Sequence, residues 1–259
     1  MSGGNDLLCQ DLSGKLSRWF ASRPDARYVI RKEFPMPTEI TVTAYKFEEL
    51  NERAKQKVRD WYCESAVHYE WWDSVYTQAK FDGEAKGFDI EDIRFSGFSS
   101  QGDGAHWTGR VDLRNFVEAN LDERSAWYGE DIVLVELWDQ GWIDRWLNIE
   151  NNNYRYCHSG GMSLSDYPRI EMEYMDEDDA AVLVDGVLGG ANVMELYRSM
   201  DVQTRVTEWC DEALQMAREY ADDIYKQLEK EYEHYTSDEC IADTCDVNDW
   251  LFNEKGEML

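Results

Sequence analysis

The strongest constraint on the fold is a long amphipathic pattern near the end of the chain. Asp201 can cap a helix that runs to about Tyr235. Its apolar residues recur at three- and four-residue spacing, which places them on one helix face. They are Val206, Trp209, Cys210, Ala213, Ala217, Tyr220, Ile224, Leu228 and Tyr232. The opposite face is nearly all charged, so we predict a long acidic C-terminal helix with one buried stripe.

The first third of the chain predicts a strand, two helices and a β-hairpin. Residues 39–45 (EITVTAY) alternate as a strand does, and the period then changes to that of a helix from Lys46 to Tyr62. A second helix, residues 69–86, has as candidate core positions Trp72, Val75, Tyr76, Ala79 and Phe81, and Gly87 suits a left-handed cap. Two strands, 90–98 and 106–113, flank a Gly-rich turn at 99–105.

The middle of the chain is less regular. Residues 114–121 suit a short helix, whereas residues 143–149 fit a helix or a strand. The remaining strand candidates are residues 131–138, 153–158 and 169–175, and the terminal WLFNEKGEML suits a hairpin. The fold class we expect is α+β, an antiparallel sheet with packed helices. We divide the chain into an N-terminal arm (1–37), a core domain (38–200) and an acidic C-terminal region (201–259).

The net charge of the chain limits the classes of partner that it can bind. The chain has 54 acidic and 26 basic residues, a formal net charge of -28. Residues 1–60 hold 11 basic and 9 acidic residues, whereas residues 201–259 hold 5 basic and 17 acidic ones. Such a field repels nucleic acid, whose binding depends on Lys and Arg, and it repels anionic membranes. We therefore expect neither nucleic acid nor a membrane as a direct partner.

The termini and cysteines suggest a reducing compartment. No apolar stretch is long enough to span a membrane, and the N-terminus does not resemble a signal peptide. Six scattered cysteines are then expected to be free thiols in the cytoplasm. A second hypothesis concerns Cys240 and Cys245: near the chain end, they could cross-link copies into a homo-oligomer once outside the reducing cytoplasm or shielded within an assembly.

Catalytic and metal-binding motifs are absent from the sequence. There is no GxSxG, HExxH or CxxC, so we expect no enzyme, catalytic residue, metal or cofactor. The Gly-rich residues 99–104 lack the Lys and Ser/Thr of a phosphate loop and favour a structural turn. The alternative function is a nucleotide or small-molecule site at this turn, with His106 and Trp107 beside it. A hydrolase with carboxylates in no recognised motif is the third hypothesis.

The charged face of the long helix is the candidate binding surface. We predict partner contacts at Glu219, Asp222, Asp223, Glu229 and Glu233. Complementary charge speeds association and fixes orientation, so this face suits a basic partner. The alternative is a solvated helix face that keeps the protein soluble.

Three segments carry a resemblance to known proteins. YKFEELNERAKQKVRDWY (residues 45–62) and FSGFSSQGDGAHWTG (residues 95–109) resemble a combination found in a family of bacteriophage proteins, and the terminal WLFNEKGEML resembles the end of those proteins. The resemblance implies a phage origin and action in the cytoplasm of an infected host. The size, acidity and C-terminal cysteines are similar to those of phage inhibitors of Gabija, a nuclease and helicase defence system. We therefore expect an anti-defence protein that inhibits a host DNA-processing complex, by coating it or by acidic DNA mimicry.

Overall fold

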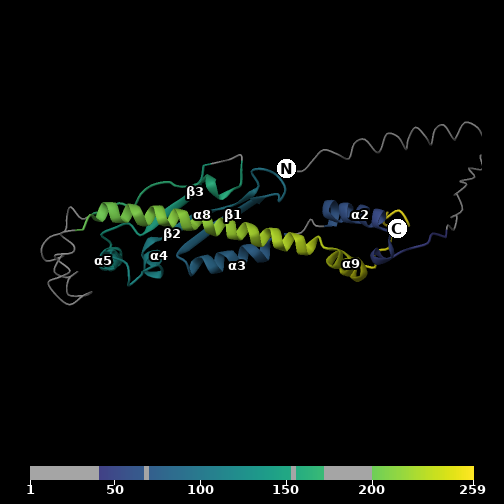
Figure 1. Cartoon of the computed structure of the whole chain (residues 1–259), viewed down its shortest axis with the longest axis horizontal. Helices are drawn as coiled ribbons and strands as arrows, with labels where there is room; N and C mark the ends of the chain where they lie inside the picture. Colours follow the sequence, from purple (N-terminus) through teal and green to yellow (C-terminus); the bar gives the residue numbers. More distant parts are fainter. Residues whose placement is uncertain (1–40, 67–69, 153–155, 172–199) are drawn as a thin grey trace, which may run out of the picture. The chain divides into compact units, whose positions relative to one another are not determined.

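The computed structural model describes residues 41–66, 70–152, 156–171 and 200–259 (Figure 1). The chain divides between Val42 and Thr43 into two units, and every helix and strand of the described residues belongs to the second unit. The expected arm, residues 1–37, lies outside the described residues. Residues 201–259 belong to the same unit as the core. The α+β class with its long C-terminal helix is confirmed.

The sheet has four antiparallel strands in sequence order. They are β1 (Phe88–Ser96), β2 (Gly104–Asp112), β3 (Trp146–Asn151) and β4 (Met162–Leu164). The predicted hairpin is confirmed as β1 and β2, which pair with Ile93 opposite Trp107. A register shift between Ile90 and Asp92 inserts one extra residue into β1. The extra residue keeps Ile90 and Ile93 both buried, so one face of the sheet stays apolar.

Two helices pack on this apolar face. In Figure 1, α8 (Val202–Tyr235) crosses the strands and contacts mainly β2, while α3 (Asp73–Glu84) contacts β1. The buried Trp107 indole donates a 3.1 Å hydrogen bond to the Ala217 carbonyl of α8. The Tyr220 hydroxyl donates a 2.7 Å bond to the Ala79 carbonyl, which joins α8 to α3.

The limits of α8 agree with the sequence prediction. The Asp201 side chain caps the helix by accepting a 3.1 Å bond from the Thr204 amide. All of the predicted stripe is buried except Tyr232, which is partly exposed. The left-handed backbone at Gly87 (φ 82°) that we predicted after the second helix is also present.

Two shorter helices pack near the start of α8. They are α4 (Leu113–Ala119), which confirms the predicted short helix, and α5 (Tyr128–Asp139). The predicted strand at 131–138 is wrong, because these residues lie in α5. Val133, Leu134, Leu137 and Trp138 are all buried, so no polar face reveals the helical period in this segment.

A second, smaller core joins the residues after Thr43 to the end of the chain. It contains η1 (Phe47–Glu49), α2 (Glu52–Trp61), the π-helical turn η2 (Tyr62–Ala66) and α9 (Asp238–Val247). Its buried side chains are Phe47, Leu50, Ala54, Val58, Tyr62, Ile241, Cys245 and Phe252. Arg59 of α2 makes bidentate hydrogen bonds of 2.6 and 2.7 Å to Asp238 of α9.

Several local predictions need correction. Only Tyr45 of the predicted strand 39–45 makes a bridge, to Phe252, and residues 39–40 lie outside the described residues. The terminal hairpin is reduced to a bridge between Phe252 and Met258. The predicted strand 153–158 is absent from residues 156–158, which precede η3 (Ser159–Gly161). Residues 153–155, and residues 172–175 of the predicted strand 169–175, lie outside the described residues. Phe81 is 70% exposed rather than buried, because it lies two residues past Ala79 on the opposite face of α3.

Candidate functional site: an acidic groove between α3 and α8

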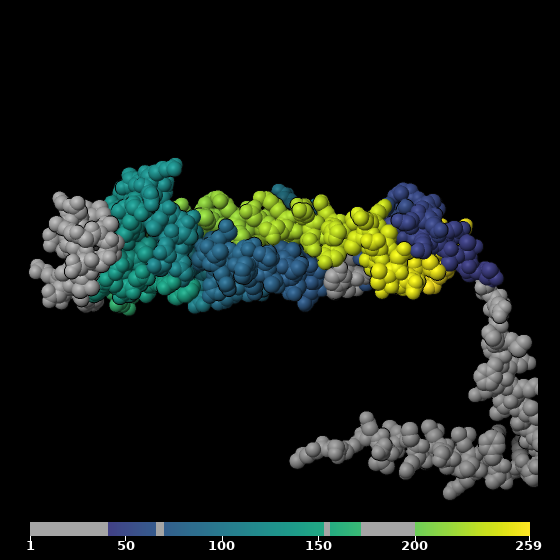
Figure 2. Space-filling model, turned by 90° about the horizontal axis from the view of Figure 1, so that it is seen from below, coloured from purple at the N-terminus to yellow at the C-terminus, as the bar shows by residue number. Residues whose placement is uncertain are grey.

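A groove of about 610 Å³ runs between the end of α3 and the middle of α8. Its lining includes three carboxylates, Asp82 from α3 and Glu219 and Asp223 from α8. The other lining residues are Ala85, Lys86, Phe88, Met216, Tyr220 and Gln227. Figure 2 shows the surfaces of the two helices side by side, with α3 in blue and α8 in yellow-green. The groove therefore presents acidic groups from both helices around Phe88, Met216 and Tyr220.

The local sequence explains how the groove is built. Glu219 and Asp223 are four residues apart and so lie one above the other on α8, next to the buried Tyr220. Burial, with smaller effects from Asp82 and Asp223, raises the pKa of Tyr220 to about 12. The phenol therefore stays neutral and keeps its hydrogen bond to α3. The Lys86 ammonium lies 5.8 Å from the centre of the Tyr220 ring.

The groove carboxylates are only partly neutralised. Asp223 pairs with Lys226 at 2.8 Å, and this contact raises the pKa of Lys226. Both side chains of that pair are exposed, so it contributes little stability. Glu219 and Asp82 each accept a hydrogen bond from a neutral glutamine, at 2.7 Å from Gln215 and 2.8 Å from Gln78. Among the described residues neither carboxylate has an ion-pair partner, although Lys86 also lines the groove.

The structure brings only some of the predicted contact residues together. Glu219 and Asp223 line the groove, whereas Asp222 accepts a 2.6 Å bond from Ser159, away from it. Glu229 is partly exposed and Glu233 is exposed, both farther along α8. Sequence reasoning missed Asp82, because no local pattern indicates that the end of α3 lies against α8.

The two cysteines near the chain end differ in accessibility. Cys245 is buried in the smaller core, and burial raises the pKa of its thiol to about 11. Cys240 is partly exposed, and both are free thiols in the structure. A cross-link through Cys245 would require the smaller core to open, whereas Cys240 could react without that step.

The Gly-rich turn is held by its own aspartate. The Asp103 carboxylate accepts bonds of 2.9 and 2.6 Å from the amides of Ser99 and Ser100, and these bonds lower its pKa. Those amides are therefore already occupied. Trp107 is fully buried and His106 nearly so, which leaves neither ring exposed for stacking on a base. These contacts favour the structural turn over the nucleotide site.

The described residues contain neither a candidate metal site nor a candidate membrane span. Within 41–66, 70–152, 156–171 and 200–259, no group of three or more His, Cys, Asp or Glu side chains has the arrangement of a metal site. In the same ranges, no helix has the length and apolar character needed to cross a membrane.

These features define an α+β protein in which a long, outwardly acidic helix covers an antiparallel sheet. The chain belongs to the family described as Domain of unknown function (DUF8835), whose sequence profile matches residues 71–238. No curated protein and no solved structure matches the chain. The matched segment contains the whole acidic groove, whereas α2 and the terminal turn lie outside it.

Proposed function

We propose that this protein is a phage-encoded anti-defence protein that acts by binding. Its target is a host DNA-processing or nuclease complex, of the Gabija type, which it keeps from engaging DNA in the host cytoplasm. The observation that carries the proposal is the groove in which Asp82 of α3 and Glu219 of α8 accept hydrogen bonds only from neutral glutamines, beside a third carboxylate, Asp223. The resemblance of residues 45–62 and 95–109 to a family of bacteriophage proteins supports the phage origin.

The occupant of the groove is a basic segment of the target's DNA-contacting surface. Such surfaces are rich in Lys and Arg because they neutralise phosphates. An Arg or Lys side chain entering the groove would meet Asp82 on one side and Glu219 and Asp223 on the other, while its aliphatic stem would pack on Met216 and Tyr220. This geometry supports binding through both charge and apolar contact.

The direct test is DNA cleavage by a purified Gabija-type nuclease and helicase complex. We expect the wild-type protein in stoichiometric excess to suppress cleavage. A variant with Lys at the groove residues Glu219 and Asp223 and at the neighbouring α8 residues Asp222 and Glu229, called the four-lysine groove variant, should lose this effect. The matched control carries Lys at four exposed carboxylates elsewhere, namely Glu48, Glu64, Glu123 and Glu150, and should still inhibit. Full cleavage in the presence of excess wild-type protein would refute the proposal for this target.

A pull-down from host lysate extends the test to other complexes. Wild-type protein and the matched control should retain the same DNA-processing complex, and the four-lysine groove variant should not. Added DNA separates the two mechanisms. Under DNA mimicry, DNA displaces the protein from the complex, whereas a protein that coats the complex outside its DNA site stays bound.

Coating would be favoured by a homo-oligomer of this protein. Non-reducing electrophoresis of freshly prepared protein and of Cys240→Ser tests whether the more accessible cysteine links copies. A dimer band present only in the wild type would support the link. A monomer band in both would rule out a disulfide link between copies. Sedimentation would then measure non-covalent assembly.

A further inference from the structure

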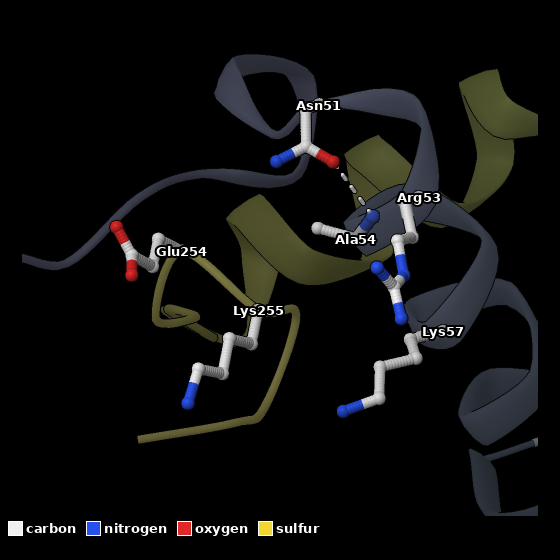
Figure 3. Close-up of a pocket in the computed structure, with 6 residues that line it drawn as sticks. All are labelled: Asn51, Arg53, Ala54, Lys57, Glu254 and Lys255. Atoms are coloured by element: carbon white, nitrogen blue, oxygen red, sulfur yellow. Dashed lines mark hydrogen bonds between the residues drawn. The ribbon is translucent and has the colours of Figure 1, made fainter.

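A second cavity has the opposite charge from the acidic groove. It measures about 390 Å³ and lies between α2 and the turn near the chain end (Figure 3). Arg53 and Lys57 of α2 and Lys255 of the turn line it, together with Asn51, Ala54 and Glu254. In Figure 3 the three cationic side chains extend in a similar direction, while Glu254 lies on the far side of Lys255 from Arg53.

The turn is fixed against α2, so the three cations are held near one another. Gly256 is buried with φ 77°, and a Cβ atom there would lie 2.4 Å from the Ala54 carbonyl oxygen. Only glycine therefore allows this approach. Asn253 stabilises the turn by accepting bonds from the amides of Lys255 and Glu257, at 2.9 and 3.1 Å.

Among the described residues, these cations have little compensating charge. Lys57 has a 3.3 Å contact with Glu257, in which both side chains are more than half exposed. Within the described part of the chain, no carboxylate lies within ion-pair distance of Arg53 or Lys255. The neighbouring Arg59, by contrast, pairs with both Glu52 and Asp238.

The placement of the cations does not serve helix stability. Arg53 lies in the first turn of α2, where a positive charge is unfavourable, and like charges four residues apart, as in Arg53 and Lys57, repel. Local features that oppose stability are expected at binding sites. In a chain of net charge -28, a pocket with three cations and one carboxylate in its lining calls for an anionic ligand.

We propose that this pocket binds the phosphate group of a small molecule. A phosphate monoester presents several oxygens and close to two negative charges, and pyrophosphate carries a larger negative charge, so either can contact all three cations at once. A carboxylate offers one charge and two oxygens, which would leave the cluster positively charged. The cavity volume lies within the usual range for small-molecule sites.

The test is isothermal titration calorimetry of the full chain with pyrophosphate at constant ionic strength. We expect one site per chain, and a Kd at least about tenfold higher in Arg53→Gln/Lys255→Gln, since each charge-assisted hydrogen bond contributes more than a factor of ten. The matched control, Arg124→Gln/Lys230→Gln, removes an exposed arginine and an exposed lysine elsewhere and should bind like the wild type. Circular dichroism checks that each variant is folded.

Two results would overturn the proposal. One is the absence of pyrophosphate binding to the wild type at millimolar concentration. The other is equal weakening in both double variants, which would indicate a general charge effect. A short single-stranded oligonucleotide distinguishes the source of the phosphate: binding of pyrophosphate alone supports a small molecule, while tighter binding of the oligonucleotide would replace it with a nucleic-acid backbone.

Discussion

The start and the middle of α8 differ in how their carboxylates are used. Near its start, the buried Asp131 of α5 accepts bonds of 2.7 and 2.9 Å from Arg205 and a 2.7 Å bond from the Trp209 indole. Near its middle, Glu219 and Asp223 are exposed and meet only neutral groups or an exposed lysine. The first arrangement holds α5 to α8. The second contributes little to folding, so its charge is available to a partner.

This difference explains why acidity alone is a poor guide to the site. With 54 acidic residues in the chain, Asp131 is indistinguishable in sequence from a solvated carboxylate. Its role depends on burial against Arg205, which is only 14% exposed. Conversely, the groove residues differ from other surface carboxylates only because Asp82 on α3 faces the same cavity.

The largest effect should come from Trp209→Ala. Trp209 is 4% exposed, and its indole also donates to Asp131. Its loss should lower the free energy of unfolding by about 3 to 5 kcal/mol, measured by urea denaturation. A loss below about 1 kcal/mol would show that the start of α8 is not held as the structure indicates.

A slightly smaller effect is expected for Asp131→Asn. The substitution keeps the shape of the side chain but leaves the mostly buried Arg205 without its main counter-charge. We expect a loss of about 3 kcal/mol in the free energy of unfolding. Asp223→Asn is the matched control and should cost less than about 1 kcal/mol, because its pair with Lys226 is exposed. Equal costs would remove the distinction between the start and the middle of α8.

A pH dependence of the stability is expected from His106. Burial is the main cause that lowers its pKa below the ordinary value of 6.5, so the folded protein holds the ring neutral. The unfolded chain binds the proton more readily. The stabilisation is thus fully present above pH 6.5 and is lost as the pH falls towards the folded pKa. The free energy of unfolding of the wild type and of His106→Gln, measured between about pH 7.5 and 5.5, tests this prediction. If the free energies of unfolding of the two proteins changed in parallel with pH, the prediction would be contradicted.

The smallest effect on stability is expected for the four-lysine groove variant. Its substituted residues are at most partly buried, and one makes an exposed ion pair, so the free energy of unfolding should change by no more than about 1 kcal/mol. Thermal unfolding beside the matched control checks this. A loss several times larger would mean that the groove carboxylates support the fold.

A helix could be predicted from the sequence when one of its faces is clearly polar and the other apolar. Helix α8 was predictable because its stripe, its charged face and its Asp201 cap all agree. Helix α5 was not, because its apolar run is buried on several sides. Helix α9 was missed although Ser237, followed by Asp238 and Glu239, is a good N-cap signal. The groove depends on contacts between helices distant in sequence, which no local pattern encodes.

The proposed function requires the acidic groove to meet a basic surface of the partner. The most direct measurement is the association rate with the purified nuclease and helicase complex at increasing salt, for the wild type and the four-lysine groove variant. Exposed charges are screened beyond about 8 Å at physiological ionic strength. The wild-type rate should therefore fall steeply with salt, and the variant should associate slowly at every salt concentration. A folded variant with unchanged rate and salt dependence would show that the groove only keeps the protein soluble.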